Sequence, residues 1–211
     1  MTHPEINNSN EPIRLFKSDF LEFFTHISPV TIIIIWLPVV IYFFIRGILL
    51  RPASAGWWYL PLAFIMGLFF WTLAEYLLHR FLFHYHAKTP AQERVFFLFH
   101  GVHHAQPRVK TRLVMPPVVS IPMASIFYGL FWLVLAQILS TPHWVGPIFS
   151  GFITGYLLYD LTHYATHHFN FRSGYFKRVR KHHMYHHFQT PNQRFGVSSP
   201  LWDYVFKTNP N

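Results

Sequence analysis

Residues 56–84 read GWWYLPLAFIMGLFFWTLAEYLLHRFLFH, an apolar run that ends in a segment containing an arginine and two histidines. Between Gly56 and Leu78 the only charged residue is Glu75. A helix of roughly 20 apolar residues is long enough to cross the hydrocarbon core of a bilayer. We therefore expect a transmembrane helix over residues 56–78, with charged residues and histidines at its C-terminal end.

Three further segments are long and apolar enough to be membrane spans: residues 29–50, 117–140 and 145–165. The first contains Pro38, where we expect a kink. The sequence therefore predicts an all-α integral membrane protein with four transmembrane helices. We expect a single domain over residues 1–211, with an N-terminal cytosolic segment (1–28) and a cytosolic helical cap (79–113 and 166–211).

The composition supports this class. Apolar residues make up 52% of the chain and charged residues only 12%, whereas soluble domains usually carry about a quarter. The net charge of +9 comes from Lys and Arg concentrated in residues 79–112 and after residue 168. The positive-inside rule then places both segments and both termini in the cytosol. Because the cations flank apolar runs, we expect lipid headgroups rather than nucleic acid as their partner.

The chain contains 16 histidines and no cysteine, so thiolate catalysis and thiolate metal sites are excluded. Ten histidines form clusters, and each cluster falls in or beside a segment predicted to face the cytosol. Two clusters have the spacing HxxHH, whereas chance at this histidine frequency would give roughly 0.1 such motifs. The ten are His79, His84, His100, His103, His104, His163, His167, His183, His186 and His187.

The spacings suit metal binding, because residues three and four apart share a face of a helix. His79 and His84 are five apart and would diverge by about 140° on one α-helix, so we expect the helix to end or bend between them. Ten imidazoles are too many for one ion, and two ions with about five ligands each are the simplest interpretation. Imidazole binds Zn, Cu, Fe and Ni, so the ligands alone do not identify the metal.

Two acidic residues lie in apolar helix near these clusters. Glu75 precedes His79 by four residues, and Asp160 precedes His163 by three. We expect each carboxylate to hydrogen-bond the distal nitrogen of a metal-bound histidine. The alternative for Glu75 is an ion pair with a nearby arginine such as Arg80. For the histidines adjoining the clusters, a role behind the ligands and no role at all are equally open: His86, His168 and His182.

The sequence resembles the fatty acid 2-hydroxylase branch of the fatty acid hydroxylase and sterol desaturase superfamily. The histidine pattern indicates the superfamily. The flanking segments EYLLHRFLFH (residues 75–84) and FGVSSPLWD (195–203) indicate the branch. The resemblance implies a dinuclear iron site held by the ten histidines, O₂ as co-substrate, and hydroxylation at C2 of a fatty acyl chain of a sphingolipid or related lipid. Zinc is an alternative occupant in isolated protein but cannot change oxidation state, which favours iron for this chemistry.

The resemblance also implies partners. Related proteins often carry a cytochrome b5 domain, and the residues before the first span are too few to fold one. We therefore expect electrons from a separate cytochrome b5-like or ferredoxin-like protein. The basic run 177–181 is expected to contact lipid phosphates, and docking of an acidic electron donor there is the alternative. This favours a bacterial plasma membrane, with the endoplasmic reticulum as the location in a eukaryote.

Other roles stay open from the sequence. Residues 195–203 are either a lid over the site or a surface turn anchored by Trp202. The same scaffold serves sterol and carotenoid hydroxylases and lipid desaturases, and a membrane metal transporter is a rival of another class. Side chains that could orient the polar head of the substrate are Tyr164, Tyr185 and Asn192.

Overall fold

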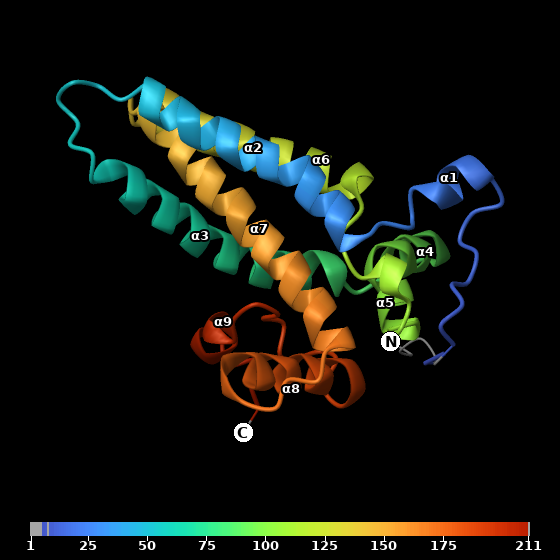
Figure 1. Ribbon diagram of the computed structural model, residues 1–211. Coiled ribbons are helices and arrows are strands. Elements are labelled where there is room, and N and C mark those ends of the chain that lie inside the picture. Colours follow the sequence, from blue (N-terminus) through green and yellow to red (C-terminus); the bar gives the residue numbers. More distant parts are fainter. Residues whose placement is uncertain (1–5, 8, 211) are drawn as a thin grey trace. The chain divides into compact units, whose positions relative to one another are not determined.

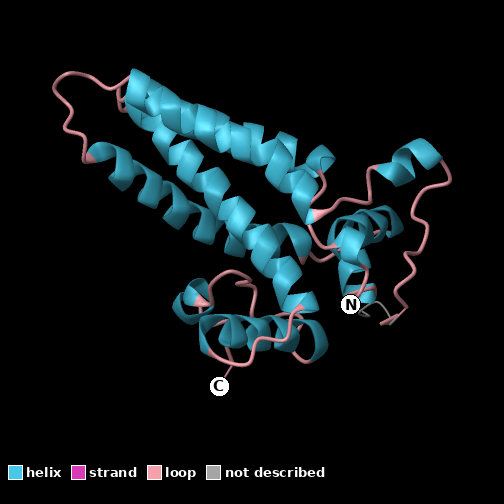
Figure 2. Cartoon of the chain, in the orientation of Figure 1, coloured by secondary structure: helices cyan, strands magenta, loops and turns pink. Residues whose placement is uncertain are grey.

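The computed structural model describes residues 6–7 and 9–210, so residues 1–5 and 8 of the predicted N-terminal segment lie outside the described part. Figure 2 shows helices and loops, and no strand occurs among the described residues. The predicted all-α class is confirmed. The α-helices, labelled in Figure 1, are α1 (Asp19–Phe23), α2 (Pro29–Leu49), α3 (Tyr59–Leu77), α4 (Pro90–Phe96), α5 (Val102–Ala105), α6 (Pro117–Phe131), α7 (Val145–His168), α8 (Gly174–Phe188) and α9 (Leu201–Val205).

Three π-helical segments adjoin the α-helices. In a π-helix each amide donates to the carbonyl five residues earlier. The three segments are η1 (Leu78–Phe83) after α3, η2 (Phe97–Gly101) between α4 and α5, and η4 (Trp132–Ile138) after α6. Two short 3₁₀ turns, η3 (Lys110–Arg112) and η5 (Pro142–Trp144), precede α6 and α7.

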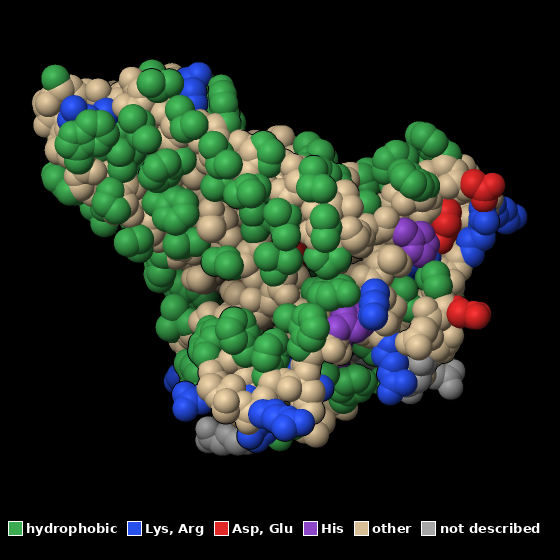
Figure 3. All heavy atoms as spheres, viewed as in Figure 1, with side chains coloured by type: hydrophobic (Ala, Val, Ile, Leu, Met, Phe, Trp, Pro, Cys, Tyr) green, Lys and Arg blue, Asp and Glu red, His purple; other side chains and the backbone are tan. Residues whose placement is uncertain are grey.

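Three helical stretches within the described residues are long and apolar enough to cross a membrane: Pro29–Leu49, Tyr59–Phe83 and Lys110–Ile138. They correspond to three of the four predicted spans. Their outward side chains are apolar, for example Ile34 at 67% and Ile126 at 70% exposure, and Figure 3 shows hydrophobic side chains over the visible face of α2. The fourth predicted span forms α7, whose length is sufficient but whose polar and histidine residues lower its hydropathy.

The chain divides into two compact units. The first, called here the membrane unit, contains residues 30–71 and 115–158. Its core is the first half of α7, which contacts α2 through Phe149 and Phe43 (ring centroids 4.8 Å apart). The same half of α7 contacts α6 through Phe152 and Phe127 (4.7 Å). Edge-to-face and tilted aromatic pairs of this kind hold helices together without relying on exclusion of water.

Two glycines allow α3 and α7 to approach closely in the membrane unit. A Cβ atom at Gly67 would lie 2.0 Å from the carbonyl oxygen of Ile148, and one at Gly151 would lie 2.0 Å from the carbonyl oxygen of Phe64. Any larger side chain would force the two backbones apart. Small residues at such crossings are typical of helix packing in membranes.

The second unit, called here the histidine unit, contains residues 1–29, 72–114 and 159–211. Its N-terminal segment is bound to the loop after α5 through the Gln106 side chain, which accepts from the Ile13 amide (2.9 Å) and donates to the Glu11 carbonyl (2.9 Å). Farther along, the buried guanidinium of Arg112 donates to Glu22 at 2.6 Å. These contacts fix the segment that carries the first HxxHH motif. All ten clustered histidines belong to this unit.

Candidate metal centre

His79 and His84 are brought together by the π-helix η1. The His84 amide donates to the His79 carbonyl at 3.1 Å, and the two rings lie 5.0 Å apart between centroids. The helix ends at Phe83, and His84 stands at its C-cap with φ −110° and ψ 30°, so the prediction that the helix ends between the two histidines is confirmed. Before it ends, the helix widens into a π-turn, which brings residues five apart to the same side, where an α-turn would separate them.

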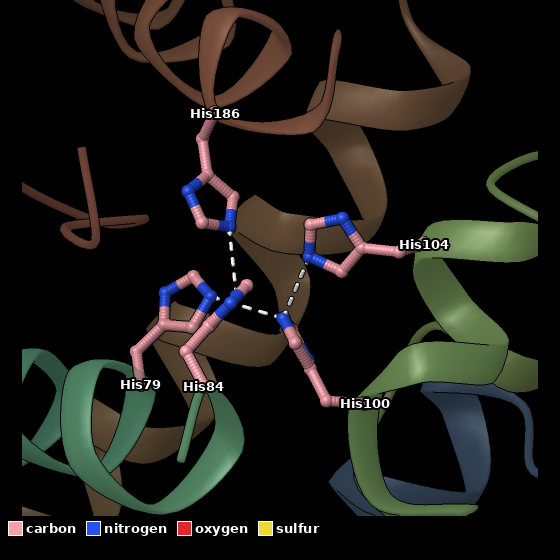
Figure 4. Close-up of side chains that lie close together, drawn as sticks. All are labelled: His79, His84, His100, His104 and His186. Carbon is pink, nitrogen blue, oxygen red and sulfur yellow. Dashed lines mark hydrogen bonds between the residues drawn. The ribbon is translucent and has the colours of Figure 1, made fainter. Parts of the chain in front are cut away.

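A first group of five histidines gathers around the end of α3. Each offers one ring nitrogen, and these nitrogens all lie within 4.8 Å of one another. Figure 4 shows the five rings pointing toward one another from η1, from the η2–α5 segment and from α8. The group is His79, His84, His100, His104 and His186.

A second group of five satisfies the same criterion, with nitrogens again within 4.8 Å of one another. Its rings come from α5, from the end of α7 and from α8. His103 lies at its centre, with its Nε2 atom 2.9 Å from the Nε2 atoms of both His163 and His187. The group is His103, His163, His167, His183 and His187.

Each HxxHH motif contributes to both groups. In the first motif, residues i and i+4 (His100 and His104) belong to the first group, and residue i+3 (His103) belongs to the second. In the other motif, His183 and His187 belong to the second group, and His186 belongs to the first. In a regular α-helix such as α8, which carries the second motif, residues i and i+4 diverge by about 40°, whereas i+3 and i+4 diverge by about 100°. We expected all three to share one direction, and this wider angle separates them.

The distances between ring nitrogens fit metal coordination. Neighbouring Nε2 atoms lie 2.9–3.1 Å apart, as between His79 and His100 (3.0 Å) and between His84 and His186 (3.1 Å). Two nitrogens each about 2.1 Å from one ion and at right angles to each other would be about 3.0 Å apart. The two groups contain only imidazole nitrogens, a donor set suited to iron as well as zinc.

The burial of the groups sets the protonation state of the rings. Desolvation lowers the pKa of the five histidines on α5, η2 and α8 well below the usual range, and the neighbouring histidines lower it further. Neutral imidazole is the form that binds metal, so the rings are ready to bind near pH 7. These five are His100, His103, His104, His183 and His187.

Two histidines of the first group are oriented by backbone carbonyls of the loop between α8 and α9, residues 189–200. The Nδ1–H of His79 donates to the Phe195 carbonyl (2.5 Å), and the Nδ1–H of His186 donates to the Gln193 carbonyl (2.7 Å). A carbonyl oxygen only accepts, so Nδ1 carries the proton and, in a neutral ring, Nε2 is left with a lone pair. Both lone pairs lie in the first group, where they can bind a cation.

The loop itself is held by Asp203, which is completely buried. Its carboxylate accepts from the amides of Phe195 and Gly196 (2.8 Å each) and from Nε2 of His182 (3.0 Å). The pKa of Asp203 lies below its usual value because, although burial raises it, the hydrogen bonds from His182, Thr208 and Gly196 lower it more. The carboxylate therefore stays ionised and keeps the loop in place.

Glu75 also holds this loop, and its placement differs from the prediction. Its Oε1 atom accepts from the amides of Val197 (2.6 Å) and Ser198 (2.7 Å), and its Oε2 atom accepts from the Ser198 hydroxyl. Neither a histidine Nδ1–H nor Arg80 takes the place that the sequence suggested. The orienting partner of His79 is instead a backbone carbonyl, which carries no signal in the sequence.

The remaining predicted residues are placed as follows. Asp160 is completely buried one turn before His163, and its predicted role behind a histidine stays a prediction. The Tyr185 ring lies against the cations of Lys181 (5.4 Å) and Arg194 (5.1 Å). Tyr164 packs on His168 (4.7 Å), and Asn192 is exposed.

The FGVSSPLWD segment combines buried residues with an exposed one, Leu201 (43%), and its role as a lid stays a prediction. Phe195, Val197 and Asp203 within it are at most 4% exposed. His182, to which we assigned no definite role, acts on this segment through Asp203. The motif was recognisable in the sequence, but the role of its aspartate was missed.

Comparison with known proteins supports this geometry. The sequence profile of the fatty acid hydroxylase family matches residues 64–208, which include all ten histidines. In a solved structure described as full-length scs7p with only the hydroxylase domain visible, the similar region covers 92% of this chain and 70% of that chain. The TM-score is 0.82 and the sequence identity is 34%.

Curated relatives extend the likeness to nearly the whole sequence. The dihydroceramide fatty acyl 2-hydroxylase FAH1 of Arabidopsis thaliana is 38% identical, over 99% of this chain and 84% of its own length. The ceramide very long chain fatty acid hydroxylase scs7 of Schizosaccharomyces pombe is 40% identical, over 90% of this chain and 53% of its own length.

Proposed function

Because the chain belongs to the fatty acid hydroxylase family, we propose that it is a membrane-bound, O₂-dependent fatty acyl 2-hydroxylase acting on the acyl chain of a ceramide or related sphingolipid. The observation that carries this proposal is the convergence of ten histidines, from four separate segments, into two groups of five. The substrate class follows from the similarity to relatives named for dihydroceramide and ceramide.

In this proposal each group holds one iron ion, and the ligands are the ten histidines of the two groups. Two bound iron ions would supply the redox chemistry that activates O₂ and breaks the C2–H bond. The chain supplies neutral Nε2 lone pairs, two of which are fixed by the Phe195 and Gln193 carbonyls. Burial of nine of the ten rings keeps bulk water away from the reacting atoms.

The proposed topology has four spans, with α7 as the fourth and both termini in the cytosol. The polar residues of α7 that lower its hydropathy are the ones that serve the site, Asp160, His163 and His167 among them. The acyl chain would then enter from the bilayer, with its carbonyl end near the histidines. Tyr164, Tyr185 and Asn192 are the proposed contacts for the polar head of the lipid.

Hydroxylation places one oxygen atom of O₂ in the product and releases the other as water, so two electrons must come from a donor protein. The proposed docking surface is the basic run on α8, where Lys177, Arg178 and Lys181 are exposed. Replacing the three with alanine should slow turnover with a protein donor and reduce its dependence on salt. An unchanged rate and salt dependence would rule out docking at this run.

The experiment that tests the proposed function compares lipids from cells that express the chain with lipids from matched cells that do not. Mass spectrometry should show sphingolipids that have gained one oxygen, with fragments placing it at C2 of the acyl chain. A loss of two hydrogens would indicate a desaturase, an oxidised sterol or carotenoid would indicate those hydroxylases, and metal accumulation without lipid change would indicate a transporter.

Variants connect the product to the metal groups. His103→Ala and His186→Ala should abolish the product and lower bound metal without preventing membrane insertion. The matched control is His86→Ala, since His86 is exposed and lies outside both groups. Full activity with normal metal content in either ligand variant would refute the assignment.

A further inference from the structure

Helix α9 exposes an apolar face for which the described structure provides no cover. Leu201, Tyr204 and Val205 are 43%, 65% and 55% exposed. They stand at positions i, i+3 and i+4, so they lie on one side of the helix. The opposite side contains the buried Asp203. In Figure 3 hydrophobic side chains lie on the visible surface over α9.

Helix α9 is attached to the last part of α3 within the histidine unit. The indole Nε1–H of Trp202 donates to the Thr72 hydroxyl at 3.0 Å. Farther along, the ring of Phe206 stacks on Tyr76 with centroids 5.2 Å apart and an interplanar angle of 14°. The depth of α9 is therefore set by the depth of Thr72 and Tyr76.

Those two residues belong to a candidate membrane span, Tyr59–Phe83. With a rise of about 1.5 Å per residue, Thr72 lies about 9 Å and Tyr76 about 3 Å before Leu78, the expected end of the span. Helices that lie in the bilayer interface bury their apolar face about 5–10 Å into the boundary between headgroups and acyl chains. Thr72 falls within this range, and Tyr76 lies nearer the end of the span, so α9 is attached at the boundary between headgroups and acyl chains.

The residues around α9 suit the same position. Leu77 and Phe81, on the end of the same span, are apolar and exposed, so the lipid-facing surface of α3 continues at this level. Tyr204 combines an apolar ring with a hydroxyl group, which is typical of residues at the membrane interface. Lys207, the second residue after α9, is exposed, and a cation at this position suits anionic headgroups.

We propose that α9 is an interfacial membrane helix whose face formed by Leu201, Tyr204 and Val205 inserts into the lipid beside the cytosolic end of α3. The partner is the bilayer itself. The inference rests on α3 crossing the membrane and is independent of the hydroxylase activity. It adds a lipid contact next to Asp203, the residue that holds the loop orienting His79.

The absence of cysteine from the chain allows a direct test. Tyr204→Cys and Val205→Cys each give the full chain one thiol, which is labelled with bimane after reconstitution into nanodiscs of phosphatidylcholine and phosphatidylglycerol. The span reference is Ile65→Cys, at an exposed position of α3, and the polar reference is Ser9→Cys, at an exposed position of the N-terminal segment.

We expect lipids brominated near the headgroup end of the acyl chain to quench the labels at 204 and 205 more strongly than the label at 9, and aqueous iodide to quench them less. Quenching by iodide alone would show that α9 lies in water. Protection from both quenchers would show that protein covers it, as in a dimer.

Either of those results, obtained while the label at 65 is quenched by lipids brominated near the methyl end of the acyl chain, overturns the proposal. A label at 65 that those deeper lipids do not quench would instead refute the span on which it rests. Leu201→Cys repeats the measurement on the same face if either variant fails to fold.

Discussion

The Nδ1–H of His79 donates to the backbone carbonyl of Phe195 across 116 residues of sequence, at 2.5 Å. The bond joins a histidine of η1, the π-helix that follows α3, to the loop between α8 and α9. Its geometry depends on the loop, and the loop depends on Asp203 and Glu75. The orientation of the His79 ring in the first group therefore depends partly on two carboxylates that hydrogen-bond the loop rather than the ring itself.

Asp203→Asn should lower activity and metal affinity by about 10–100-fold, as is typical when the partner of a metal-bound histidine is disturbed. The amide side chain replaces one accepting oxygen with a donor, so the carboxylate can no longer accept from Phe195, Gly196 and His182 together. Metal analysis across a chelator titration measures the effect, and metal should leave the first group before the second.

The matched control for this variant is Asp19→Asn, whose carboxylate is on the surface. Wild-type metal retention in Asp203→Asn would show that the loop does not orient His79. Equal loss from both groups would point to general destabilisation instead.

Because each HxxHH motif contributes to both groups, single variants should change the number of metal ions bound per chain. His104→Ala removes a ligand of the first group only, and His183→Ala removes a ligand of the second only. Each variant should bind about one ion where the parent binds two, if each group holds one ion as proposed. Metal quantification of purified protein, with His86→Ala as the control, measures this. Loss of both ions in both variants would mean that the groups do not bind independently.

The stability of the metal-free protein should depend on pH. Burial keeps the pKa of His103 and His187 in the folded state well below the unfolded value of about 6.5. Between those two values the unfolded chain binds more protons, so stability falls as the pH drops below about 6.5. Unfolding temperatures of the metal-free protein in detergent, from about pH 7.5 to about pH 5.5, should decline on the acid side. A flat curve over that range would contradict the neutral, buried rings.

The contact between Glu22 and Arg112 should matter for folding. The Arg112 side chain is 3% exposed and Glu22 is 13% exposed. Glu22→Gln leaves a buried guanidinium without its counter-charge, which costs on the order of 3 kcal/mol. The unfolding temperature should fall clearly, whereas Glu93→Gln, at an exposed position of α4, should leave it unchanged. Equal unfolding temperatures would show that the N-terminal segment is not held through this pair.

The sequence by itself determined the fold class, the candidate spans and the ten histidines. Apolar runs in 29–50, 56–78 and 117–140 need no distant partner to be recognised, because their length and hydropathy are local properties. The HxxHH and HxxxH spacings are equally local. The FGVSSPLWD segment was noticed as a motif, although its function was not.

Only the tertiary structure decided how those histidines are divided and what orients them. The widening of η1, which brings His79 beside His84, depends on packing around the helix end rather than on the residue types. The separation of His103 from His104 depends on where α7 and α8 present their own rings. The carbonyl of Phe195 has no sequence signal at all, because every residue has one. Its role arises only when residues 116 positions apart meet, and the folded chain alone fixes that meeting.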